Sequence, residues 1–225
     1  MNNKKEGVNM LKKLNEFTPE EFESQKHPFS IKRLSTTIGA ELHDIDLTKD
    51  LSKEEIGHIY NALLTYKVIF FRDQNITTEE HLRFGQYFGE LEIHPFAPLG
   101  TNREDHPEVL RITHDEENKP KENAWHSDVT WRQEPSLGSI LRMIETPPVG
   151  GDTLFASMES AYENLPDAIK EKIDGTYAVH DFTIFRKRLE KQGKTPEEIE
   201  AFNKKFPKPT HPVVRTHPDT GKKSI

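Results

Sequence analysis

The sequence predicts a double-layer jelly roll decorated by helices, a mainly β protein of the α+β class. Two observations lead to this prediction. Short segments rich in Val, Ile, Thr and Phe recur between turns marked by Gly and Pro, as in folds built from many short strands. Between them, a few segments repeat apolar residues at the helical spacing of three and four. At 225 residues the chain suits one domain, or one domain with an extension.

The N-terminal part differs in composition from the rest. Residues 1–27 are rich in Lys, Glu and Asn, which predicts a mobile polar extension; a few apolar anchors would suffice for a short surface helix as the alternative. The predicted domain then covers residues 28–225. Its first apolar residues alternate from Phe29 to Leu42, and this alternation indicates edge strands.

Helix starts are marked by capping boxes, in which Ser or Thr is followed three residues later by Glu. Such boxes begin at Ser52, Thr77 and Thr195, and they predict a helix over 53–66, a helix from 78 that Gly89 ends, and a helix that begins at Pro196. Two further short helices are predicted, one from Ser157 and one from Pro166.

Strands are predicted where β-branched and aromatic residues cluster between turn residues. The predicted segments are 68–71, 126–131, 139–144, 153–156, 177–182 and 213–216. After the last of them, residues 218–221 form a predicted turn with Gly221 at a position that favours positive φ. This turn would return the chain as a partner strand.

Composition and charge exclude several classes of function. The net charge is −7 without a cluster of basic residues, so we expect no nucleic-acid partner. No apolar run has the length of a membrane span, and the charged N-terminus does not resemble a signal peptide. The chain has no Cys, which excludes disulfides and thiol chemistry. A cytoplasmic enzyme with no membrane partner is the resulting expectation.

The candidate metal ligands are His126 and Asp128. On an extended strand residues i and i+2 share one face, so this pair would aim an imidazole nitrogen and a carboxylate oxygen at one point. Two His and one carboxylate form the facial triad of non-haem Fe(II) oxygenases. The pair alone is a weak signal, because His and Asp meet at this spacing by chance. His217 and Asp219 repeat the spacing in a predicted turn, where the two side chains need not converge.

Several segments agree, in order and with similar spacing, with one enzyme family. The chain resembles the taurine dioxygenase (TauD/TfdA) family of Fe(II)- and 2-oxoglutarate-dependent oxygenases over about residues 28–225. The matching segments are 38–41, 68–74, 88–91, 125–130, 150–154 and 211–218. The resemblance implies a double-stranded β-helix, which is the same jelly roll that the strand pattern predicts.

The resemblance also implies roles for individual residues. His126 and Asp128 would bind Fe(II), and Thr153 would contact the co-substrate 2-oxoglutarate, although by chemistry alone Thr153 is an ordinary strand threonine. Substrate contacts would come from His94, from the backbone amide of Val129 and from the aromatic ring of Phe182. An imidazole can donate a charge-assisted hydrogen bond to an anion, which suits His94 to an anionic group.

The implied reaction uses O2 and converts 2-oxoglutarate to succinate and CO2 while a small anionic substrate is hydroxylated. A taurine-like sulfonate, which releases sulfite, is the expected substrate. Ala97 stands where the family's taurine enzyme has a Tyr, so an alkyl sulfate or an aryloxyalkanoate is the alternative. We also expect a homo-oligomer.

The end of the chain departs from the family pattern. The family's distal iron His and its 2-oxoglutarate-binding Arg lie beyond the segment that corresponds to 215–218, and the sequence ends soon after it. The expectation is a domain truncated at the C-terminus, with little or no activity of its own. A non-catalytic jelly roll that binds an anion or a partner is a second hypothesis. A zinc hydrolase is disfavoured because no further His stands at a recognisable ligand spacing.

Overall fold

The computed structural model describes residues 18–94, 102–103, 105–115, 124–181, 187, 189–191 and 193–225. The chain forms two compact units. The first unit comprises Met1–Ile112, Arg142–Leu165 and Thr216–Ile225, and the second comprises Thr113–Leu141 and Pro166–Arg215.

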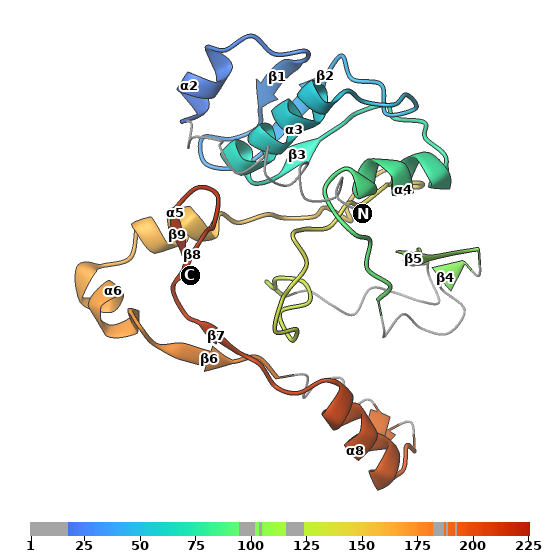
Figure 1. Cartoon of the computed structure of the whole chain (residues 1–225), viewed down its shortest axis with the longest axis vertical. Helices are drawn as coiled ribbons and strands as arrows, with labels where there is room; N and C mark the ends of the chain where they lie inside the picture. Colours follow the sequence, from blue (N-terminus) through green and yellow to red (C-terminus); the bar gives the residue numbers. More distant parts are fainter. Residues whose placement is uncertain are drawn as a thin grey trace, which may run out of the picture. The chain divides into compact units, whose positions relative to one another are not determined.

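A three-stranded mixed sheet lies in the first unit, with the order β1-β2-β3 (Figure 1). Strands β1 (Ser30–Arg33) and β2 (Ala40–His43) are antiparallel, whereas β2 and β3 (Ile69–Phe70) are parallel. Parallel neighbours need a crossover connection, and α3 (Lys53–Tyr66) provides it. The expectation that 38–42 forms an edge strand was wrong, since β2 occupies the centre of the sheet.

The helices α3 and α4 (Thr78–Gln86) begin at the predicted capping boxes. At the start of α3, Ser52 Oγ accepts from the Glu55 amide at 3.2 Å, while the Glu55 carboxylate accepts from the Ser52 amide at 2.7 Å. Both helices contribute buried side chains to one hydrophobic core, which also contains residues of β2. The main core residues are Phe22, Phe29, Ala40, Leu42, Leu47, Ile59, Ala62, Tyr66, Ile76 and Phe84.

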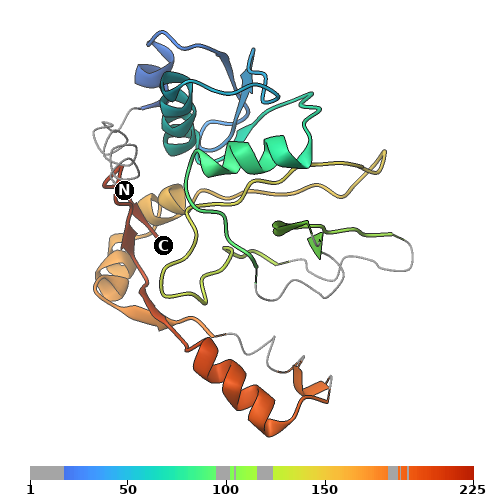
Figure 2. The same cartoon turned by 45° about the vertical axis from the view of Figure 1, so that its right-hand side comes forward.

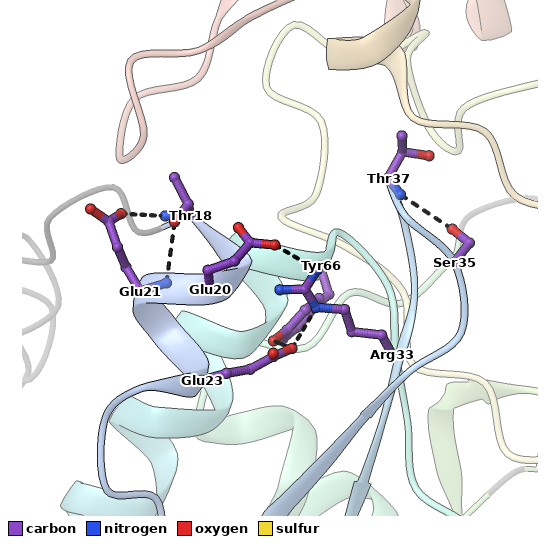
Figure 3. Close-up of polar contacts among 8 residues, drawn as sticks. All are labelled: Thr18, Glu20, Glu21, Glu23, Arg33, Ser35, Thr37 and Tyr66. Carbon is purple, nitrogen blue, oxygen red and sulfur yellow. Dashed lines mark hydrogen bonds and ion pairs between the residues drawn. The ribbon is translucent and has the colours of Figure 1, made fainter.

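The short helix α2 (Pro19–Glu23) belongs to this core, because the side chain of Phe22 is fully buried. Two ion pairs connect the helix to β1: Arg33 contacts Glu20 at 2.8 Å and Glu23 at 2.6 Å (Figure 3). The hydroxyl of Tyr66 on α3 also donates to Glu23 at 2.7 Å. The packed unit therefore begins before residue 28, and part of the expected polar extension supplies core material.

Two hairpins and one helix complete the first unit. The first hairpin pairs β4 (Asn102–Arg103) with β5 (His106–Leu110), which the sequence did not predict. The second pairs β8 (Arg215–Thr216) with β9 (Lys223–Ser224). Gly221 in its turn has φ +70°, which confirms the predicted turn and returning strand. Helix α5 (Met158–Glu163) begins after Ser157 as predicted.

The described part of the second unit includes an antiparallel pair of strands and the helices α6 and α8. Strands β6 (Tyr177–Val179) and β7 (Thr210–Pro212) run side by side in both views (Figures 1 and 2). Helix α6 (Asp167–Ile173) follows Pro166 as predicted, and α8 (Pro196–Lys205) begins at the predicted capping box. The ring of Phe206, just after α8, lies edge-on to Trp131 with 5.3 Å between the ring centroids.

Three predicted strands are absent from the structure. Residues 126–131, 139–144 and 153–156 have no strand, and these segments are drawn as coil in Figures 1 and 2. A strand needs a neighbour to complete its hydrogen-bond ladder, and several large side chains here, including Leu141 and Leu154, are exposed. Among the described residues more lie in helices than in strands, and a mixed sheet with helices is what the α+β class predicts. The mainly β jelly roll stays a prediction.

No helix in the described part of the chain combines the length and apolar character that crossing a membrane requires. The expected cytoplasmic location and the expected homo-oligomer remain predictions.

Candidate metal centre

His126 and Asp128 face each other within the second unit. Nε2 of His126 lies 3.4 Å from Oδ1 of Asp128. The predicted shared strand face does not cause this convergence. Instead the chain turns after Asp128, and the amide of Arg132 donates to the carbonyl of Val129 at 3.0 Å. The expected pairing of the two side chains is present, but a turn produces it.

A backbone carbonyl fixes the orientation of the His126 ring. Nδ1 of His126 is 3.0 Å from the carbonyl oxygen of Ala124. A carbonyl only accepts, so Nδ1 carries a hydrogen, and Nε2 is the ring nitrogen that faces Asp128. Histidines that bind metals are commonly held in this way, by a backbone acceptor on the second ring nitrogen.

The carboxylate of Asp128 is anchored at its other oxygen. Ser139 Oγ donates to Oδ2 at 3.0 Å, and Oδ1 remains on the side of His126. Nothing in the spacing of the sequence pointed to Ser139, which was predicted to begin a strand. The side chains of His126 and Asp128 are 67% and 60% exposed, so solvent reaches both donor atoms.

The donor set suits a divalent transition metal. Two metal–ligand bonds of roughly 2.1 Å, at angles between octahedral and tetrahedral, place adjacent ligand atoms roughly 3.0–3.4 Å apart. The 3.4 Å between His126 Nε2 and Asp128 Oδ1 falls at the upper end of this range. A neutral imidazole and a carboxylate are also the ligand types of the facial triad. In the part of the chain that the structure describes, no group of three or more His, Cys, Asp or Glu side chains gathers around one point.

Val129, next to the carboxylate, has a rare backbone conformation. Its φ is +48°, a region that β-branched residues seldom adopt and that costs about 1–3 kcal/mol. Such conformations persist only where the surroundings enforce them, and they cluster at functional sites. Val129 is half-buried, and its backbone amide was the predicted substrate contact.

The other predicted site residues lie in the first unit or outside the described residues. Thr153 is exposed and lies outside any strand of the first unit, and His94 is half-buried in the segment after α4. Phe182 lies outside the described residues. Only His126, Asp128 and Val129 of the predicted set are thus seen together.

The second His-x-Asp pair, His217 and Asp219, has another role. The amide of Asp219 donates to Nδ1 of His217 at 3.2 Å, and the Asp219 carboxylate accepts from the Tyr60 hydroxyl at 2.9 Å. His217 therefore contacts the backbone of the turn between β8 and β9, and Asp219 contacts α3, in agreement with the expectation that the two side chains need not converge.

The ring nitrogen of His126 and the carboxylate of Asp128 define a candidate centre for a divalent metal. The chain belongs to the taurine catabolism dioxygenase TauD, TfdA family, whose model matches residues 30–225. An alkylsulfatase of Acinetobacter baylyi is 36% identical over 87% of this chain and 61% of its own length. An alpha-ketoglutarate-dependent sulfate ester dioxygenase of Pseudomonas putida is 32% identical, over 92% and 67%. An (S)-phenoxypropionate/alpha-ketoglutarate-dioxygenase of Sphingobium herbicidovorans is 30% identical, over 88% and 69%.

Solved structures of the family have the same fold over the shared part. A taurine dioxygenase from Burkholderia xenovorans matches with a TM-score of 0.69 at 36% identity, over 88% of this chain and 62% of that protein. The enzyme AAD-2, crystallised with Mn(II) and N-oxalylglycine, matches with a TM-score of 0.63 at 29% identity, over 88% and 68%. The chain thus spans 61% to 69% of the length of these relatives.

Proposed function

We propose that this protein is an Fe(II)- and 2-oxoglutarate-dependent dioxygenase that oxidises a small organosulfur anion. The observation that carries the proposal is the convergence of His126 Nε2 and Asp128 Oδ1 at 3.4 Å, within a chain of this family. Two relatives are alpha-ketoglutarate-dependent by name, and a solved relative holds Mn(II) and N-oxalylglycine. Bound iron would supply the activation of O2, and the protein would supply its orientation and an environment for the substrate.

The residues of this chain would orient the metal and its ligands before the reaction. The hydrogen bond to Ala124 presents Nε2 of His126, and the hydrogen bond from Ser139 leaves Oδ1 of Asp128 available. We assign Thr153 to 2-oxoglutarate, as the family resemblance implies. His94 would donate to the anionic group of the substrate, with the Val129 amide and the Phe182 ring as further contacts.

The substrate class we favour is a sulfate ester, with a taurine-like sulfonate as the alternative that the sequence first suggested. Two relatives act on alkyl sulfates or sulfate esters by name, at 36% and 32% identity. Ala97 stands where the taurine enzyme of the family has a Tyr, which weakens the case for taurine. An aryloxyalkanoate, the substrate type of a third relative, is the remaining candidate.

Metal binding tests the ligand assignment. Anaerobic Fe(II) titration in the presence of 2-oxoglutarate is carried out on the parent chain and on His126→Ala, Asp128→Asn and His217→Ala. Loss of an outer contact of a metal site already costs about 10–100-fold in affinity, so loss of a ligand should cost at least this much. His217→Ala is the matched control, because it removes the His of the second His-x-Asp pair and should bind like the parent. Equal affinities for all four proteins would refute the assignment.

Product analysis tests the substrate class. Hydroxylation of the carbon that bears the anionic group releases sulfate from an alkyl sulfate, sulfite from taurine, and a phenol from a phenoxypropionate. From a form of the enzyme that also carries the distal His and the Arg of the family, we expect sulfate release, coupled one-to-one to succinate. His94→Ala should raise KM more than it lowers kcat, as expected when ground-state binding is lost. Phenol as the sole product, with kinetics insensitive to His94, would contradict the organosulfur proposal.

A further inference from the structure

His211 contacts the backbone of the turn that follows Asp128. Its Nε2 lies 2.8 Å from the carbonyl oxygen of Thr130 and 3.0 Å from that of Arg132. Both partners only accept, so Nε2 carries the hydrogen and shares it between the two carbonyl groups. The contact joins residues far apart in the sequence, and it is partly buried from water.

The His211 side chain, which donates this hydrogen bond, belongs to a strand that is itself held by backbone hydrogen bonds. His211 lies in the middle of β7, where it is paired with Ala178 of β6. Two further backbone bonds flank this pair: the His180 amide donates to Pro209 at 2.9 Å, and the Val213 amide donates to Thr176 at 2.9 Å. The His180 ring packs edge-on against the His211 ring, with 4.8 Å between centroids. The position and the tilt of the imidazole are therefore restrained.

The two carbonyl groups that accept from His211 belong to a turn with a strained backbone. Val129 has its unfavourable φ of +48° in this turn, and a backbone bond from the Arg132 amide to the Val129 carbonyl closes the turn. His211 donates to the carbonyl groups of Thr130 and Arg132, which lie just after the strained residue. A strained conformation of this kind costs about 1–3 kcal/mol, so it relaxes unless neighbouring contacts oppose it.

We propose that His211 is a positioning residue of the metal centre: its Nε2–H holds the turn in the conformation that keeps Asp128 opposite His126. This inference rests on the proposed function, in which His126 and Asp128 are metal ligands. His211 acts through the backbone, and its imidazole has a different partner from the metal. Relaxation of Val129 would rotate the adjacent carboxylate away from the 3.4 Å approach to His126.

The test uses Co(II), a spectroscopic substitute for Fe(II), with the full chain and five variants. His211→Phe keeps a ring against His180 but lacks the donor, while His211→Gln places an amide N–H close to the position of Nε2. We expect about a 10-fold loss of Co(II) affinity and an altered visible spectrum for His211→Phe, at the lower end of the range for outer contacts of metal sites. His211→Gln should restore the parent affinity and spectrum.

The double variant Val129→Gly/His211→Phe provides a second, independent measurement. Glycine adopts positive φ without strain, so the turn should need less restraint, and the loss caused by His211→Phe should shrink. This variant also keeps the test decisive if His211→Phe fails to fold, which circular dichroism would reveal. The comparison is then between this double variant and Val129→Gly alone, for which we expect similar affinities.

The outcomes separate the two proposals. If the parent and His126→Ala bind Co(II) equally, the metal centre itself is wrong and His211 has no centre to position. If His126→Ala loses binding but His211→Phe does not, the metal centre stands and the role of His211 is refuted. Two results would refute the hydrogen-bond restraint. One is an equal loss of Co(II) affinity in His211→Gln and His211→Phe. The other is a loss caused by His211→Phe that is as large in the Val129→Gly background as in the parent.

Discussion

Replacement of Phe22 by Ala tests whether the chain before residue 28 is part of the folded core. The side chain is fully buried, and it is the buried residue of the short helix α2. Its ring centroid lies 4.2 Å from that of His27 and 6.0 Å from that of Tyr66. A buried Phe→Ala change removes transfer free energy and leaves a cavity, together about 3–5 kcal/mol.

We expect the lower part of this range for Phe22→Ala, a loss of about 3 kcal/mol in the free energy of unfolding. A helix of five residues can shift to fill part of the cavity, which reduces the cavity contribution. The exposed ion pairs of α2 with Arg33 cannot compensate, because surface pairs contribute little.

Urea unfolding followed by far-ultraviolet circular dichroism measures the change. Gln25→Ala, an exposed position just after the same helix, is the matched control and should stay within about 0.5 kcal/mol of the parent. Faster tryptic cleavage after Lys26 should accompany the loss in Phe22→Ala. A destabilisation below about 1 kcal/mol, with unchanged cleavage, would show that α2 is an extension with no energetic part in the core.

Two further predictions concern titratable side chains of α3. Burial, and then the nearby charge of His27, lower the pKa of His58, so the unfolded chain takes up this proton first. The contribution of neutral His58 to the free energy of unfolding should be complete above pH about 6.5 and should fall as the pH drops below it. Urea midpoints measured across this pH range should therefore decline in the parent, and an equal decline in His58→Gln would contradict the prediction. Burial, followed by the hydrogen bond to Asp219, raises the pKa of Tyr60 to about 12. Burial also raises the pKa of Tyr66, so ultraviolet titration should show two late-ionising tyrosines. Tyr60→Phe should remove the one that ionises near pH 12 and cost about 1.5 kcal/mol in urea unfolding.

The parts of the fold that the sequence predicts well depend on local interactions. The capping boxes at Ser52, Thr77 and Thr195 each form both of their hydrogen bonds, because all the atoms involved lie within four consecutive residues. Thr18 begins a box of the same kind, but it was overlooked since the polar composition around it suggested an extension. The predicted strands at 139–144 and 153–156 failed because β propensity does not supply a partner.

The candidate site shows the same division between local and distant interactions. The spacing of His126 and Asp128 correctly suggested that their side chains could meet, yet the local structure is a turn and not a strand. Ser139 and His211, which anchor the carboxylate and its turn, could not be found from spacing. Ser139 contacts Asp128 across 11 residues, at no spacing that a motif would mark. His211 contacts the turn across about 80 residues, and it binds carbonyl groups, which every residue carries and which leave no trace in a sequence.

The central position of β2 also has a consequence for how the first unit forms. Its antiparallel pairing with β1 closes a short loop, whereas its parallel pairing with β3 waits until α3 has crossed between them. Closing the longer loop costs more chain entropy, and contacts between distant residues slow the search for the native state. Formation of the β1–β2 hairpin should thus precede the docking of β3, and the arrival of Ile69 and Phe70 beside Ala40 and Glu41 would set the rate at which the sheet is completed.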